Sequence, residues 1–156
     1  MLAKSARACL GAWRDATFRI EGRGAYADSL LNVESIRIVS ARLGAALAEA
    51  EPKVELLRVP IIDKKTTEQV YFFANVLEHV DCLDREASGV KRMLGDEIAR
   101  LERVVIDEAR VPAERQLFRV ARYSKAHVVR RSLAERLTGA GVTVGIRWTE
   151  LGQEVE

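Results

Sequence analysis

The sequence has few cysteines and no long apolar run, and each shortage excludes a class of protein. Two cysteines in 156 residues, Cys9 and Cys82, allow at most one disulfide, so this is not a disulfide-stapled domain. The apolar part of "MLAKSARACLGAW" is too short for a signal peptide. No stretch approaches the roughly 18 apolar residues of a membrane helix. We therefore expect a cytoplasmic protein with free thiols and no membrane partner.

The sequence also lacks a large excess of one charge, because 25 basic residues nearly balance 23 acidic ones. The net charge of +2 therefore indicates nothing about partners. With 48% hydrophobic and 31% charged residues the composition is globular, and the length suits a single domain, 1–156. The bases gather late in the chain: eight Lys or Arg stand between Arg110 and Arg136 against two acids.

Catalytic and metal-binding motifs are missing too. "LEHVDCLDRE" places His79 and Cys82 three residues apart, but His127 and Cys9 are the only other residues of their kind, too few for a convincing zinc site. Cysteine hydrolases draw nucleophile and base from distant segments, and neither "GVTVG" nor "GRGAY" is a phosphate loop. "IIDKKTT" could handle phosphate, although a solvated turn explains it better. We predict no catalytic residues, no metal and no cofactor.

The apolar spacing and the capping patterns in the sequence favour helices. Leu2 to Trp13 carries apolar residues at helical spacing, and Asn32 can cap a helix that ends before Pro52. Thr66 and Gln69 have the spacing of a capping box before the run "VYFFANVL". A strand is possible for this run, since Val, Tyr and Phe favour sheets, but the cap favours a helix.

The strongest amphipathic pattern predicts a helix over 88–109. Its apolar stripe has intervals of 4, 4, 3 and 4 and consists of Val90, Leu94, Ile98, Leu101 and Val105. Ala99 and Val104 flank the stripe, which makes it broader than one partner helix requires. This face could pack internally, but its breadth favours a homodimer.

A few strands complete the expected fold. We expect short strands from 17–20, 53–62 and 142–150, with 53–62 held to a sheet edge or an extended connector by Pro60. Residues 116–123 could be helix or strand. The predicted fold class is α+β, predominantly α-helical, with about five helices and two to four short strands. Within it we distinguish a helical part, 1–109, from a possible winged-helix-like part, 110–156.

The basic segment predicts a terminal helix over 124–138, with Ser124 as its N-cap and glycines after its end. Its apolar stripe includes Val129, Leu133 and Leu137. Its polar faces carry four candidate nucleic-acid-binding residues: Lys125, His127, Arg130 and Arg131. A helix that reads a major groove presents such a face. An ordinary terminal helix with a solvated basic face is the alternative.

Residues 113–152 resemble the winged helix-turn-helix superfamily. The matching residues are Ser124-Lys125, Val128, "ERL" at 135–137, "GAGV" at 139–142 and "WTELG" at 148–152. The resemblance implies a small, non-enzymatic nucleic-acid-binding or regulatory protein. The alternative hypothesis is a protein–protein interaction or assembly component that uses the helix 88–109 to contact another subunit or a second copy of itself.

Overall fold

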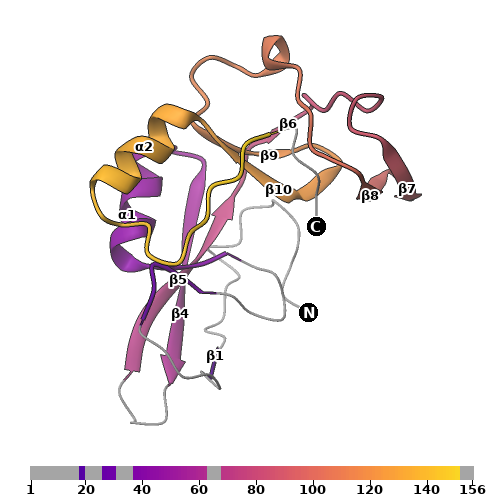
Figure 1. The fold of residues 1–156 in the computed structure, drawn as a ribbon. Coiled ribbons are helices and arrows are strands. Elements are labelled where there is room, and N and C mark those ends of the chain that lie inside the picture. The colour runs from indigo at the N-terminus through magenta and orange to yellow at the C-terminus, as the bar shows by residue number, and fades with distance from the viewer. Residues whose placement is uncertain (1–17, 20–25, 31–36, 63–67, 152–156) are drawn as a thin grey trace.

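The computed structural model describes residues 18–19, 26–30, 37–62 and 68–151. Strands dominate these residues (Figure 1), so the prediction of a predominantly helical protein is wrong and the fold is mainly β. The elements in chain order are β1 Phe18–Arg19, β2 Ser29–Leu30, β3 Ile38–Ser40, α1 Ala41–Ala50, β4 Val54–Ile62, β5 Glu68–Val76, β6 His79–Val80, β7 Val90–Leu94, β8 Glu97–Leu101, the short 3-10 helix η1 Glu108–Arg110, β9 Leu117–Val120, β10 Tyr123–Val129 and α2 Arg131–Gly139.

The largest sheet has the strand order β1-β4-β5-β3-β2. All its pairs are antiparallel except β1 with β4. The strand predicted over 53–62 is confirmed as β4, which pairs with β5 along its whole length. Its predicted place at a sheet edge is wrong, because β1 pairs with the other side of β4. Among the described residues β1 pairs with Ile61 and Ile62 and not with Pro60, so the missing N–H of the proline costs no described hydrogen bond to β1.

The run "VYFFANVL" is a strand, not the helix that the capping-box spacing predicts. β5 lies between β4 and β3, and from Phe73 to Val76 it is buried on both faces, which explains why its sequence is apolar nearly all round. Val and the aromatic residues strongly favour a central strand, and this preference outweighs the local helix signal of the capping-box spacing. Thr66 itself lies outside the described residues, as does the helix expected near residues 2–13.

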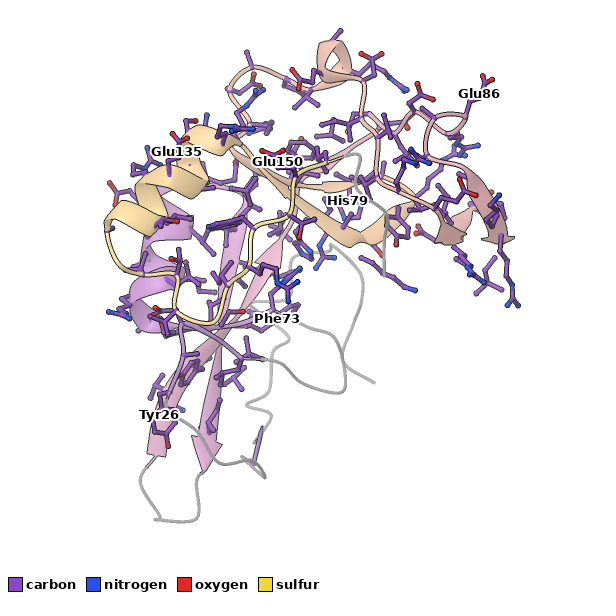
Figure 2. The ribbon with its side chains drawn as sticks, viewed as in Figure 1. Tyr26, Phe73, His79, Glu86, Glu135 and Glu150 are labelled. Carbon is purple, nitrogen blue, oxygen red and sulfur yellow. The ribbon has the colours of Figure 1, made fainter. Side chains whose placement is uncertain are left out.

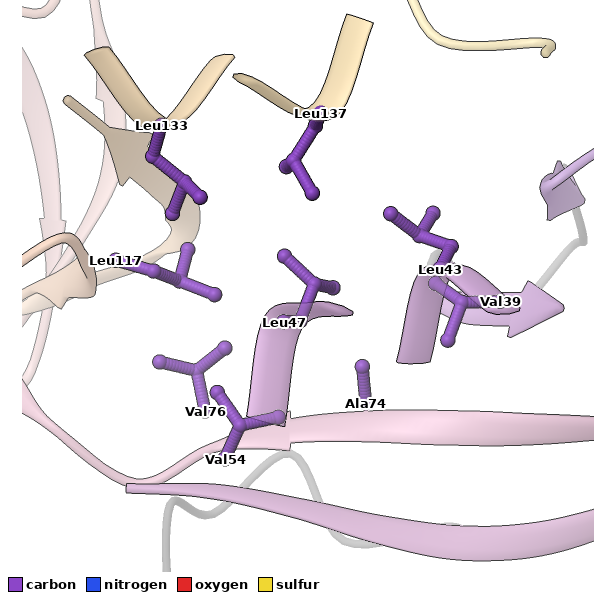
Figure 3. Packing of buried hydrophobic residues seen from close by; sticks show 9 residues of the cluster. All are labelled: Val39, Leu43, Leu47, Val54, Ala74, Val76, Leu117, Leu133 and Leu137. Carbon is purple, nitrogen blue, oxygen red and sulfur yellow. The ribbon is translucent and has the colours of Figure 1, made fainter. Parts of the chain in front are cut away.

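The two α-helices lie side by side on one face of this sheet (Figure 1). The helix predicted to start at Asn32 begins instead at Ala41, where the Ser40 hydroxyl accepts from the Leu43 amide at 3.2 Å. Figure 3 shows the core between the helices and the sheet. It consists of Val39, Leu43, Leu47, Val54, Ala74, Val76, Leu117, Leu133 and Leu137.

A second sheet, in the order β10-β9-β6, continues from the end of β5. Residues 117–120, for which a strand was one of two expectations, form its central strand β9. One face of this sheet packs with the β7–β8 hairpin in a separate cluster around Phe118, Val120, Ile98 and Leu101. Cys82 is a free, fully buried thiol in this cluster, as expected, whereas Cys9 lies outside the described residues.

The predicted helix 88–109 is wrong: the segment forms the two-stranded hairpin β7–β8 followed by η1. Gly95 adopts a φ of +60° in the two-residue turn with Asp96, a conformation that glycine reaches without strain. Ile98 and Leu101 of the predicted stripe are buried, but Leu94 is exposed. The helical intervals are therefore coincidental, and the homodimer argued from a helical face loses its basis.

The predicted helix 124–138 is also wrong in its first half. Residues 123–129 form β10, and α2 starts only after Arg130. The strand expected over 142–150 is absent, since this segment is irregular. A strand therefore occupies the place of a recognition helix, and no β wing follows. These differences contradict the winged helix-turn-helix interpretation.

The irregular segment after α2 is held by one buried carboxylate. Asp28, 1% exposed, accepts from Ser40 Oγ at 2.6 Å, from Arg42 Nε at 2.6 Å and from the Val144 amide at 3.0 Å. The Asp28 amide donates to the Val144 carbonyl at 2.8 Å. Three segments distant in sequence thus meet at this side chain.

Candidate functional site

The β7–β8 hairpin projects from the end of the molecule opposite α1 and α2 (Figure 1). It is anchored at two levels: close to its turn the Ile98 amide donates to the Arg122 carbonyl at 2.6 Å, and at its base the Glu102 amide donates to the Ser88 carbonyl at 3.1 Å. Lys91 and Glu102 form an ion pair across the two strands at 2.6 Å. The hairpin is therefore a braced projection whose outer end is free to meet another molecule.

The outer end of the hairpin, residues 93–97, is called here the hairpin tip. Two large apolar side chains lie there in solvent, Met93 at 41% and Leu94 at 71% exposure. Single exposed apolar residues are ordinary, but these two follow each other at the end of an anchored hairpin, which makes this end a candidate contact surface. Methionine and arginine are enriched in protein interfaces, and arginines lie directly behind this tip.

Those arginines are Arg92 and Arg100, which are partners in the β7–β8 register and are both exposed. Like charges opposite each other destabilise a strand pair. No Asp or Glu among the described residues forms an ion pair with either guanidinium. The arrangement suits a partner surface that combines an apolar hollow with acidic groups beside it.

A second cluster of bases crosses the β10-β9-β6 sheet and is called here the basic row: His79, Arg119 and His127. Arg119 is the register partner of both histidines, so the three side chains lie on one face. The Arg119 Nε donates to His127 Nε2 at 3.3 Å. Figure 2 shows His79 at the β6 side of this sheet.

The His127 ring is neutral at physiological pH. Burial lowers its pKa to about 3, and the nearby Arg37 and Arg119 guanidinium groups add to the effect, while the Lys125 backbone opposes it. Because Nε2 accepts from Arg119, the single ring proton belongs on Nδ1. Nδ1 is buried without a well-formed hydrogen bond to any described residue. Partial burial and Arg119 also lower the pKa of His79.

The two histidines of the sequence are expected to titrate differently. His79 should titrate somewhat below 6.5, whereas the His127 ring should stay neutral down to about pH 3. Since the unfolded chain takes up the His127 proton near 6.5 and the folded protein does not, stability should fall with pH below 6.5, by up to about 1.4 kcal/mol per pH unit. Imidazole Hε1 shifts recorded across this range by NMR check the assignment.

His79→Gln and His127→Gln identify the two signals and separate their contributions to the pH dependence. The His127→Gln protein should lose most of the slope of stability against pH between 6.5 and 4. A His127 signal that titrates near pH 6.5 in the folded protein would contradict the half-buried, neutral ring.

The four residues predicted to bind nucleic acid do not share a helix face. Lys125 and His127 lie on β10, with Lys125 exposed and His127 in the basic row. Arg130 donates to the Arg115 carbonyl at 2.6 Å and to the Pro112 carbonyl at 3.1 Å, and so fastens the loop before β9. Arg131 forms an exposed ion pair with Glu150 at 2.8 Å. Their contact with nucleic acid stays a prediction, without the helix geometry on which it depended.

Arg37, Arg119 and the hairpin tip were not among the residues predicted from the sequence to form a site. Arg119 sits in a run that alternates between two faces, "LFRV", but only the strand register shows its histidine neighbours. The dipeptide Gly95-Asp96 between two apolar runs was the available signal for the hairpin.

The described residues contain neither a metal-binding cluster nor a membrane-spanning helix. Among the described residues, no three His, Cys, Asp or Glu side chains gather closely enough to hold a metal ion. Within those ranges neither helix has the length and apolarity needed to cross a bilayer. Burial raises the pKa of the Cys82 thiol, which disfavours a reactive thiolate there.

Comparison with known proteins identifies the chain's relatives. No curated protein matches the sequence. A family model described as Immunity protein family (Imm11) matches residues 13–153, which is nearly the whole chain. No winged helix-turn-helix family is detected, so the resemblance drawn over 113–152 is accidental. The chain belongs to the Immunity protein family (Imm11).

Proposed function

We propose that this chain is a non-enzymatic immunity protein that neutralises a protein toxin by binding it, with the hairpin tip as the central contact. The family match supports a role in protein–protein interaction, which agrees with the assembly hypothesis rather than the nucleic-acid one. The observation that carries the choice of surface is the exposure of Leu94, 71%, at the end of an anchored projection.

The expected partner surface follows from the chemistry of the hairpin. We expect the toxin surface to have an apolar hollow that accepts Leu94 and Met93, since burying a leucine or methionine side chain contributes about 1.5–3 kcal/mol to binding. We also expect acidic groups beside that hollow, because carboxylates are complementary in charge to the guanidinium groups of Arg92 and Arg100. Because the hairpin base is fixed by backbone hydrogen bonds, little ordering of the backbone is needed on binding.

The hairpin tip is tested by Leu94→Asp. The substitution removes the apolar anchor and places a carboxylate where the partner is expected to be apolar and acidic. Loss of a central anchor costs about 2 kcal/mol or more, so toxin affinity should fall at least about 30-fold. Folding should be nearly unchanged, since Leu94 packs against little of its own protein.

Growth of cells that produce the toxin provides the readout. Wild-type protein should restore growth and Leu94→Asp should not. Two controls separate the explanations: Leu94→Met keeps an apolar side chain, and Ala45→Asp places the same charge on the exposed side of α1, far from the hairpin. Both should protect. Full protection by Leu94→Asp at equal protein level would refute the assignment of the tip.

A further inference from the structure

A cavity of about 270 Å³ lies where α1, α2, β5, β10 and the segment 146–151 meet. Its size is near the lower end of known ligand cavities, roughly 300–1,000 Å³. Much of its wall is the core face shown in Figure 3, including Leu43, Leu47, Val76 and Leu117. A cavity with such a wall favours an apolar occupant over water.

The charged side chains in the wall are all of one sign. Arg37 and Arg147 line the cavity together with the His127 ring, and the lining contains no Asp or Glu. Nor does any carboxylate elsewhere in the described residues form an ion pair with Arg37 or Arg147. An apolar cavity with cations in its wall is chemically complementary to an anion attached to a hydrocarbon chain.

Two of these groups have unmet electrostatic or hydrogen-bonding capacity. Partial burial lowers the pKa of Arg37 because desolvation disfavours the charged guanidinium, and no carboxylate of the described residues forms an ion pair with it to offset that loss. His127 holds a buried Nδ1 that lacks a well-formed hydrogen bond to the described residues. A bound carboxylate would satisfy both groups, since it pairs with a guanidinium and accepts a hydrogen bond from a ring N–H.

We propose that this cavity binds a small monocarboxylate, with its apolar chain along Leu43, Leu47 and Leu117 and its carboxylate held by Arg37, Arg147 and the His127 ring. The site is separate from the hairpin tip and does not depend on toxin binding. Either proposal can therefore fail while the other stands.

Sodium octanoate is the probe, measured by calorimetry and by methyl NMR of the full-length protein. Octanamide has the same chain without the charge, and inorganic phosphate has charge without a chain. Octanoate should bind at least about tenfold more tightly than octanamide, and phosphate should not compete with it. Leu47 and Leu117 methyl signals should shift with octanoate, whereas those of Leu94 should not.

Arg37→Gln should weaken octanoate binding at least about tenfold and leave octanamide binding unchanged. Arg147→Gln, at an exposed position, provides a second variant should Arg37→Gln fold poorly. Arg131→Gln is the matched control, because this arginine is equally basic but pairs with Glu150 outside the cavity. It should bind octanoate as the wild type does.

The same carboxylate chemistry could come from the end of a peptide, so acetyl-Leu-Leu with a free carboxyl group forms a separate arm. Octanoate binding without peptide binding supports the small-molecule ligand. Peptide binding without octanoate binding would overturn it. Equal affinity for octanoate and octanamide, or methyl shifts confined to residues outside the cavity, would overturn the carboxylate site altogether.

Discussion

Leu133→Ala is expected to lower the free energy of unfolding by about 2–5 kcal/mol, the usual range for a buried leucine. Leu133 is fully buried, and Figure 3 shows it reaching from α2 toward Leu117 of β9. It therefore joins α2 to the second sheet while Leu137 reaches toward α1. Its removal leaves a hole where three elements meet, which limits how far the neighbours can close in.

Arg131→Ala is the matched control on the same helix. The Arg131 side chain is 77% exposed and its ion pair with Glu150 is solvated, so stability should change by less than about 1 kcal/mol. Denaturant melts of the two variants give the comparison. Equal stability of Leu133→Ala and wild type would show that α2 is not packed as described.

Asp28→Ala is expected to destabilise the fold by about 2–4 kcal/mol, because hydrogen bonds to charged groups are strong and three donors would lose their buried, charged acceptor. The donors are the Ser40 hydroxyl, the Arg42 guanidinium and the Val144 amide. The segment after α2 depends on this side chain, so it should loosen first. Hydrogen exchange at the Val144 amide reports that loosening directly.

The same carboxylate predicts a pH dependence. The hydrogen bond from Arg42 holds the pKa of Asp28 below its ordinary value of 3.8. The stability it contributes is therefore complete above 3.8 and is lost as pH falls through the lower, folded-state pKa. Asp28→Ala should flatten the acid limb below pH 3.8, while the His127 slope above it remains. An unchanged acid limb would contradict this role.

Local patterns in the sequence located some parts of this fold correctly. The strand at 53–62 follows from β-branched residues before a proline, and the burial of Leu133 and Leu137 follows from their four-residue spacing. Both features are set by residues close in sequence. A helix ending near Gly139 was also readable, because glycine commonly terminates helices.

Features that depend on contacts between residues distant in sequence could not be predicted from the sequence alone. β5 became a strand because β3 and β4 pair with it on either side, which no spacing within "VYFFANVL" reveals. In the segment 88–109, helical intervals and a glycine turn gave conflicting signals, and the packing of Ile98 and Leu101 on the second sheet favours the hairpin. The assembly hypothesis named this segment as the contact, and the proposed interface still lies within it, on a hairpin rather than a helix.

The basic row shows the same limit at the level of a site. His79 is far from Arg119 and His127 in sequence, and the three side chains are brought into one row only by the register of β6, β9 and β10. His127 was singled out for its place among other bases on a helix. In the structure its importance comes from burial beside Arg37 and Arg119.

The most direct test of the proposed function is the dissociation constant of the purified toxin complex, measured by calorimetry for wild type, Leu94→Met, Ala45→Asp and Leu94→Asp. We expect a stoichiometric complex with similar affinity for the first three proteins and at least about 30-fold weaker binding for Leu94→Asp. Equal affinity for all four, or hydrogen-exchange protection that excludes residues 93–97, would contradict the hairpin tip as the toxin-binding surface.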